Sequence, residues 1–228
     1  MSLEQARLSS FEYETPQKEL VGFDVDLMRA IAKAEGFDVK FINTPWEGIF
    51  ATVDKGDRDI IMSGITITDK RKQVVDFSKP YFLAHQLILT DKSVKINKLS
   101  DLSKGSVAVV SGSAGDVAAS KAFGKASTRI RRFDNTPLAL EELNQGGVVA
   151  AIGDIGVLAF YARNNPDKHF NMTRDPAFEE QYFGIAVKKG NQKLIDKINA
   201  GLEKVIASGE YNKIYRKWFG TDAPKLPQ

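Results

Sequence analysis

Arg71 carries the group best suited to bind a small anion, and it follows the run Ser-Gly-Ile-Thr at residues 63–66. At the end of a strand, backbone N–H groups and the Thr66 hydroxyl can donate to one carboxylate oxygen while a guanidinium donates to both. Each such charge-assisted hydrogen bond contributes about 1.5–3 kcal/mol. These residues therefore predict a carboxylate site around Gly64, Thr66 and Arg71. Because residues 70–72 are Lys-Arg-Lys, a solvated surface charge is the competing interpretation of Arg71.

A second anion-binding candidate is the turn Ser-Gly-Ser-Ala-Gly at residues 111–115, which precedes a predicted helix. Small residues such as Ser113 and Ala114 let a ligand approach the backbone, and a helix N-terminus favours negative charge. A plain loop explains the same residues. Asp154 follows the apolar run 148–152 and offers the opposite charge, because its carboxylate can pair with an ammonium group or simply cap the next helix.

Trp46 adds a flat aromatic surface near another predicted strand end, within the sequence Pro-Trp-Glu-Gly at residues 45–48. An indole ring there can stack on a planar or cationic group, and core packing is the alternative. Taken jointly, Arg71 and Asp154 describe a receptor for a zwitterion, whose carboxylate and ammonium groups meet opposite charges.

Other chemistries lack the residues that they need. The chain has no Cys, and its two His, His85 and His169, lie in no metal-ligand motif, so we expect no metal site. It contains no P-loop, no G-x-G-x-x-G and no G-x-S-x-G, so we expect no nucleotide cofactor and no serine nucleophile. The net charge of +3 is spread along the chain, and the basic run 70–72 has no interleaved aromatic residues, which argues against nucleic acid as the main partner.

Alternating helices and strands must position these groups. The predicted elements include a helix over 24–35 that Asp24 caps and Gly36 ends, strands over 37–42 and 59–63, a short helix capped by Thr68, strands over 86–90 and 107–110, and a helix over 116–123. With 228 residues, 43% of them hydrophobic, the chain is long enough for two lobes of roughly 100 residues each. The fold class is therefore α/β, with two parallel-rich sheets flanked by helices, and ligands are expected beyond the carboxyl ends of strands.

The beginning of the chain bears on its destination. No apolar run reaches 18 residues, and residues 1–10 lack the apolar core of a signal peptide. We therefore expect a soluble chain that is either cytosolic or already trimmed of its leader.

Five segments together resemble the bacterial amino-acid-binding proteins of ABC importers, of the glutamine and lysine/arginine/histidine type. They occur in the family's order and extend from residue 11 to residue 220. The segments are FEY at 11–13, VGFDVDL at 21–27, SGITITDKR at 63–71, VDFS at 75–78 and YNKIYRKWFG at 211–220.

The resemblance implies a periplasmic-binding-protein-like fold of two lobes that close on one free L-amino acid. Two crossing strands, near Leu87–Thr90 and Gln181–Gly184, would join the lobes. Lobe 1 would then comprise residues 1–88 and 184–228, and lobe 2 residues 89–183.

The resemblance also implies roles for the candidate residues. Arg71 would bind the α-carboxylate together with the backbone around Thr66 and Ala114. The Gly64 carbonyl and the Asp154 carboxylate would bind the α-amino group. Trp46 would line the pocket for the ligand side chain.

The first strand departs from the family pattern. Family members usually open with a strand of the Val-Gly-Thr-Asp kind, followed three residues later by an aromatic side chain. Counting back from Phe11, those two positions hold Gln5 and Leu8, and residues 1–4 make a poor strand. Trp46 favours a basic amino acid, whereas Gln5 removes the carboxylate that would pair with its distal cation, so glutamine or another polar amino acid stays open.

The expected function is non-catalytic delivery of a polar L-amino acid, with a basic one slightly favoured, to the permease subunits of an ABC importer. We expect a monomer on the periplasmic or extracellular face of the membrane, with no cofactor. An enzyme of the cyclohexadienyl-dehydratase type and the sensor domain of a receptor are the alternatives on the same fold.

Overall fold

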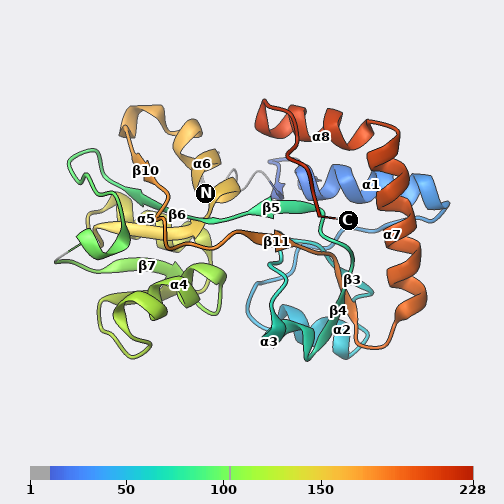
Figure 1. Ribbon diagram of the computed structural model, residues 1–228, viewed down its shortest axis with the longest axis horizontal. Helices are drawn as coiled ribbons and strands as arrows, with labels where there is room; N and C mark the ends of the chain where they lie inside the picture. Colours follow the sequence, from blue (N-terminus) through green and yellow to red (C-terminus); the bar gives the residue numbers. More distant parts are fainter. Residues whose placement is uncertain (1–10, 103, 228) are drawn as a thin grey trace. The chain divides into compact units, whose positions relative to one another are not determined.

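The computed structural model describes residues 11–102 and 104–227 and divides them into two compact units. We call residues 84–180 the middle lobe, and residues 11–83 and 181–227 the terminal lobe (Figure 1). The chain passes from one lobe to the other after Leu83 and returns after Glu180. The boundaries expected from the sequence, after residues 88 and 183, lie a few residues further along the chain than these two crossing points.

The middle lobe contains a five-stranded sheet in the order β10-β6-β9-β7-β8. Strand β7 pairs parallel with β8 and β9, whereas β6 pairs antiparallel with β9 and β10. The strands are β6 (Gln86–Thr90), β7 (Val107–Val110), β8 (Ile130–Phe133), β9 (Ala150–Asp154) and β10 (Asn171–Thr173). The helices are α4 (Ala114–Phe123), α5 (Thr136–Asn144) and α6 (Ile155–Asn164), with short 3₁₀ turns at Leu99–Asp101 and Pro166–Lys168.

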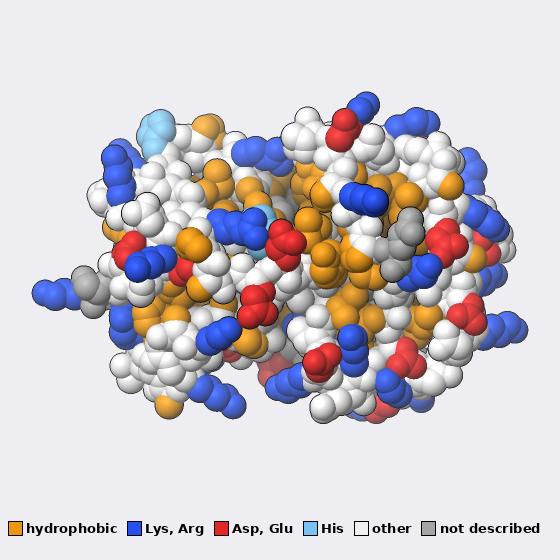
Figure 2. All heavy atoms as spheres, viewed as in Figure 1, with side chains coloured by type: hydrophobic (Ala, Val, Ile, Leu, Met, Phe, Trp, Pro, Cys, Tyr) orange, Lys and Arg blue, Asp and Glu red, His pale blue; other side chains and the backbone are white. Residues whose placement is uncertain are grey.

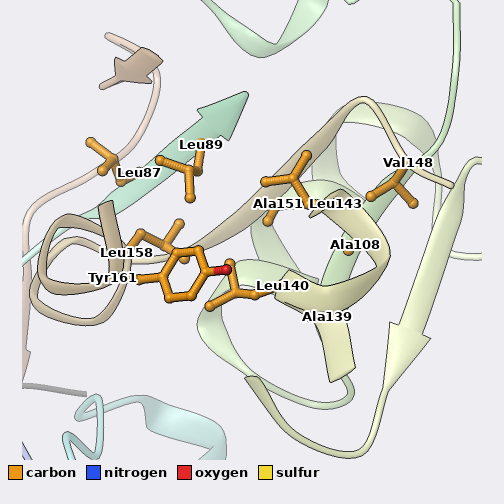
Figure 3. Close-up of a cluster of buried hydrophobic side chains, with 10 residues drawn as sticks. All are labelled: Leu87, Leu89, Ala108, Ala139, Leu140, Leu143, Val148, Ala151, Leu158 and Tyr161. Atoms are coloured by element: carbon orange, nitrogen blue, oxygen red, sulfur yellow. The ribbon is translucent and has the colours of Figure 1, made fainter. Parts of the chain in front are cut away.

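Side chains on both faces of this sheet are buried. All five residues of β6 are buried, and alternate residues along a strand point to opposite faces. Leu87 and Leu89 accordingly pack with Leu140 and Leu158 in one hydrophobic cluster, which Figure 3 shows. Ile88 belongs to a second cluster, which includes buried residues of β7 and β9. Strand β6 is therefore a central strand with side chains packed on both faces of the sheet.

The terminal lobe contains a three-stranded sheet in the order β3-β12-β4, and β12 pairs antiparallel with both neighbours. The sequence predicts parallel-rich sheets in both lobes, but among the described strands parallel pairs occur in the middle lobe alone. The reason is that β12 reaches the sheet after the return crossing and runs opposite to the two earlier strands. The strands of this sheet are β3 (Ile60–Ile61), β4 (Val75–Phe77) and β12 (Ala186–Lys188). Two further two-stranded sheets are formed by β1 (Tyr13–Glu14) and β2 (Leu20–Val21), and by β5 (Phe82–Ala84) and β11 (Gln181–Phe183).

Helix α1 packs against α7 and α8 through a continuous apolar stripe. The predicted stripe on α1 is confirmed, because Leu27 and Ile31 are completely buried. Gly201 on α7 permits the close approach, since a Cβ there would lie 2.8 Å from Cγ2 of Ile31. The helices of this lobe are α1 (Phe23–Glu35), α2 (Ile49–Asp54), α3 (Asp69–Lys72), α7 (Gln192–Ala207) and α8 (Glu210–Phe219).

An aromatic cluster joins α1, α8 and the β5–β11 pair within the terminal lobe. The ring of Phe11 lies edge-on to that of Phe82 at 4.9 Å and to that of Phe183 at 5.1 Å, centroid to centroid. Phe23 and Phe219 complete the contact at 5.2 Å. Pairs of this geometry contribute about 0.5–1.5 kcal/mol beyond their burial. The cluster therefore anchors residues 11–24 and 81–83, which carry the polar groups described next.

Charged side chains of both signs are scattered over the face drawn in Figure 2. Figure 2 shows Lys and Arg interspersed with Asp and Glu over the drawn face. Within the described part of the chain, no helix is both long and apolar enough to cross a bilayer.

Candidate functional site

Arg71 is held in place by four contacts within the terminal lobe, with Thr68, Thr66, Trp46 and Phe50. Its backbone N–H is bonded to the hydroxyl of Thr68 at 3.2 Å, which confirms Thr68 as the cap of α3. Its guanidinium donates from Nη1 to the Thr66 carbonyl at 2.8 Å. The same guanidinium lies 5.3 Å from the ring centroids of both Trp46 and Phe50. A carbonyl and two aromatic rings therefore orient the charge, unlike a freely solvated side chain.

The segment before Arg71 is fixed by its backbone. Gly64 has a positive φ of 56°, and a Cβ there would lie 3.3 Å from the Phe183 ring. Thr66 is 2% exposed and forms an isolated antiparallel bridge with Phe183, while Ile67 N–H donates to the Tyr182 carbonyl at 2.8 Å. Residues 182 and 183 of the return crossing therefore fix the position of the segment that carries Gly64 and Thr66.

Asp24 supports this segment from inside the lobe. Its Oδ2 accepts the Gly64 N–H at 2.8 Å and the Tyr81 hydroxyl at 2.9 Å, and its side chain is 1% exposed. Burial raises the pKa of the Asp24 carboxyl, and the nearby charge of Glu12 raises it further against the two hydrogen bonds. Burial also raises the pKa of Glu12, which accepts a hydrogen bond from the Ser63 hydroxyl. The prediction that Asp24 caps helix α1 is wrong, because Gly22 occupies the N-cap position and Asp24 points inward.

In the middle lobe, Ser113 is the N-cap of α4 and Ala114 is its first residue. The Ser113 hydroxyl accepts the Asp116 N–H at 3.2 Å, so it keeps its own proton to donate. Asp116 in turn accepts the Gly112 N–H at 3.0 Å and the Nε–H of Arg132 at 3.0 Å on each carboxylate oxygen. Burial disfavours the Asp116 charge, but the bonds from Arg132 and Gly112 outweigh it and lower the pKa of this carboxyl. Residues 111–113 thus form a turn whose backbone is fixed by Asp116, and residues 114 and 115 already belong to the first turn of α4.

Asp154 ends β9, directly opposite Gln86 on β6. Its Oδ1 accepts a hydrogen bond from Nε2 of Gln86 at 2.8 Å, and its side chain makes no capping bond to α6. Asp154 therefore occupies the N-cap position of α6, as the capping alternative expects, but its side chain bonds to Gln86 and makes no capping hydrogen bond. Gln86 is 1% exposed, and Gly115 of α4 packs close to it, since a Cβ at Gly115 would lie 3.3 Å from Oε1 of Gln86 and 2.5 Å from the Ile152 carbonyl oxygen.

The structure brings the candidate residues together within each lobe. In the terminal lobe the contacts of Arg71 join Trp46, Thr66 and the segment that begins at Gly64. The middle lobe carries Ser113, Ala114 and Asp154 at the carboxyl ends of the parallel strands β7 and β9. Gln5 and Leu8 lie outside the described residues.

Sequence reasoning missed three contributors. Phe50 lies on α2, four residues after Trp46, but Trp46 precedes that helix, so the contact of both rings with Arg71 does not follow from helical spacing. Asp24 and Gln86 contact residues far away in the chain, so no local pattern reveals them. Among the described residues there is no group of three or more His, Cys, Asp or Glu able to hold a metal ion.

Two α/β lobes, each with polar groups of fixed orientation at the carboxyl ends of its strands, define a two-lobed solute-binding protein. The chain belongs to the bacterial extracellular solute-binding proteins, family 3, whose pattern matches residues 5–221.

Three relatives illustrate the match. A probable histidine-binding protein of Neisseria gonorrhoeae is 44% identical over 95% of this chain and 81% of its own length. The glutamine-binding protein GlnH of a Bacillus subtilis ABC transporter is 36% identical over 90% of this chain and 74% of its own. The solved structure of the arginine-, lysine-, histidine-binding protein ArtJ from Geobacillus stearothermophilus is 42% identical, with a TM-score of 0.91 over 96% of this chain and 94% of that one. All three are named as binding proteins.

Proposed function

We propose that the chain binds a free basic L-amino acid without converting it, and delivers it to the permease subunits of an ABC importer. The observation that supports this function best is the Arg71 guanidinium, which is oriented by the Thr66 carbonyl and the Trp46 ring and whose planar fork of donors matches the geometry of an α-carboxylate. The names of the histidine-binding relative and of ArtJ support a basic ligand. Glutamine is the second candidate ligand, since GlnH is named for it.

The two lobes would divide the recognition of the zwitterion. Arg71 and the backbone around Thr66 would bind the α-carboxylate, with Ser113 and Ala114 at the N-terminus of α4 adding donors. The Gly64 carbonyl and Asp154 would bind the α-ammonium group. Trp46 and Phe50 would face the rest of the ligand. We further propose a monomer that works in the periplasm or on the extracellular face, in line with the family's description as extracellular.

A thermal shift assay against the twenty amino acids tests this function. A ligand at 100 times its dissociation constant stabilises the folded state by about 2.7 kcal/mol. We expect L-histidine, L-arginine or L-lysine to raise the melting temperature more than acidic or apolar amino acids do. A chain whose melting temperature responds to none of the twenty would contradict the proposal, and turnover of prephenate or arogenate would favour an enzyme.

Replacing Asp154 by asparagine should weaken binding of that amino acid about 10-fold, because the acceptor facing the ammonium group loses its negative charge and the ion pair becomes an ion–dipole hydrogen bond. The fold should persist, since Gln86 can donate equally well to an amide oxygen. Titration calorimetry gives the affinity. The exposed Asp167→Asn is the control, with the same change of charge in the same lobe. Equal affinities of the two variants would show that Asp154 does not bind the ammonium group.

A further inference from the structure

The buried carboxyl of Asp24 is not explained by the helix on which it lies. Helix α1 begins at Phe23, its N-cap is Gly22, and the backbone N–H of Asp24 already donates to the Phe11 carbonyl at 3.0 Å. A carboxylate taken out of water costs several kcal/mol unless hydrogen bonds compensate. The apolar stripe of α1 would accept an aliphatic residue at this position without that cost. The hydrogen bonds that the carboxylate oxygens of Asp24 accept must therefore explain the residue.

One oxygen of Asp24 holds two distant parts of the terminal lobe together. Oδ2 accepts from Gly64, 40 positions along the chain, and from the Tyr81 hydroxyl, 57 positions along. The other oxygen, Oδ1, is buried and has no hydrogen-bond partner among the described residues. The bonding is thus concentrated on the oxygen that faces Gly64, and it is not spread to satisfy the whole carboxyl.

The Gly64 N–H is the link between this buried bond and the candidate site. Gly64 lies in a left-handed conformation, so its peptide groups can turn readily if nothing fixes them. The bond to Asp24 fixes the N–H inward, and Thr66 two residues later is fixed by its bridge to Phe183. These two anchors together determine the direction of the Gly64 carbonyl and of the backbone up to Thr66, whose carbonyl Arg71 contacts.

The middle lobe repeats this arrangement. There a carboxylate, Asp116, accepts the N–H of a glycine, Gly112, which also has a positive φ of 67° and precedes Ser113 and Ala114. In both lobes an acidic side chain therefore pins a left-handed glycine directly before the residues assigned to the ligand. The two carboxylates differ in their surroundings, since Asp116 is paired with Arg132 whereas Asp24 is buried and accepts a hydrogen bond from the Tyr81 hydroxyl.

We propose that Asp24 is a positioning residue for ligand binding, which fixes the Gly64–Thr66 segment through the Gly64 N–H. The inference rests on the proposed amino-acid-binding function. The role requires an acceptor oxygen at this point and does not require its charge. Asparagine should therefore preserve ligand binding when it replaces Asp24, whereas leucine should not. Tyr81 assists by donating to the same oxygen.

The test compares four variants by calorimetry with L-histidine and L-arginine, together with melting temperatures without ligand. We expect Asp24→Asn to bind within about 3-fold of the wild type, Asp24→Leu to bind at least about 10-fold more weakly, and Tyr81→Phe to lie between them. Tyr211→Phe is the matched control, because its buried hydroxyl donates at 2.6 Å to the Tyr81 carbonyl and does not contact the segment. It should lower the melting temperature and leave the affinity unchanged.

Hydrogen exchange of the Gly64 amide supplies a readout independent of any ligand. Exchange should be at least about 10-fold faster in Asp24→Leu and in Tyr81→Phe than in Tyr211→Phe. If Asp24→Leu does not fold, Tyr81→Phe decides the question. Wild-type affinity in every folded variant, whatever its melting temperature, would overturn the inference. Failure of the wild-type chain itself to bind any of the twenty amino acids would instead overturn the proposed function, and the inference with it.

Discussion

Replacing Arg71 by alanine is expected to weaken amino-acid binding at least about 100-fold, because two charge-assisted hydrogen bonds to the carboxylate disappear and each contributes about 1.5–3 kcal/mol. The fold should be unaffected. Arg71 lies on the four-residue helix α3, none of whose residues is buried, and its aromatic neighbours Trp46 and Phe50 stay in place. Calorimetry with the amino acid that most raises the melting temperature measures the loss.

Two further variants locate the effect. Lys70→Ala removes an exposed charge from the same helix and should bind like the wild type. Arg71→Lys keeps the charge but loses the planar pair of donors, so its affinity should fall between those of the alanine variant and the wild type. If Arg71→Ala retained a ligand-induced shift in melting temperature equal to that of Lys70→Ala, the carboxylate would have to be bound elsewhere.

Replacing Gly22 by alanine should destabilise the chain by about 3 kcal/mol or more, through backbone strain and a clash that cannot relax. Gly22 has a φ of 151°, and a Cβ there would lie 2.0 Å from the Phe11 carbonyl oxygen and 2.6 Å from the Glu12 Cα. Both contacts are with backbone, so no side chain can rotate away. The same carbonyl accepts the Asp24 N–H, and the start of α1 would be displaced with it.

Gly36→Ala separates strain from clash at the other end of the same helix. Gly36 has a φ of 64° but nothing lies within 4 Å of the position of its Cβ, so the cost should be about 1 kcal/mol. Urea unfolding followed by circular dichroism gives both free energies. Equal losses for the two variants would show that the close approach of Phe11 to Gly22 does not constrain the chain.

Elements with a local signal were predictable from the sequence. The apolar stripe and the terminal Gly36 of α1, the Thr68 cap and the strands at 86–90 and 107–110 were all predicted and are confirmed. Each depends on residues no more than a few positions apart, such as a cap hydroxyl and the N–H three residues on. The family resemblance, which the family match confirms, also rested on short segments read in order.

Features that depend on distant partners could not be read in this way. Residues 37–42 alternate between partly buried and exposed side chains, as predicted for a strand, yet no strand among residues 11–102 and 104–227 pairs with them and they are not assigned to one. The antiparallel pairing of β12 likewise follows from the path of the chain and not from its composition.

For the candidate site, residue types in the sequence indicated which side chains to consider, but the sequence did not reveal which of them contact one another. Arg71, Trp46 and Thr66 were chosen for their chemistry, and the structure places them in contact. Gln86, which bonds to Asp154, is 68 positions away from it, and nothing in either local sequence connects the two. The roles of these residues toward a ligand remain predictions for the experiments above.

The central position of β12 has a consequence for the order of folding during synthesis. Residues 186–188 supply the strand on which both β3 and β4 pair, and α7 and α8 follow it in the chain. A nascent chain that has emerged as far as residue 180 already contains the whole continuous lobe, whereas the other lobe lacks its middle strand. Because domains fold as units as they leave the ribosome, the lobe that starts first should be completed last. The early segments of that lobe should stay unfolded until the C-terminal segment has been synthesised. Apolar residues that are buried in the folded lobe, such as Ile61 and Val75, should be exposed to solvent until then.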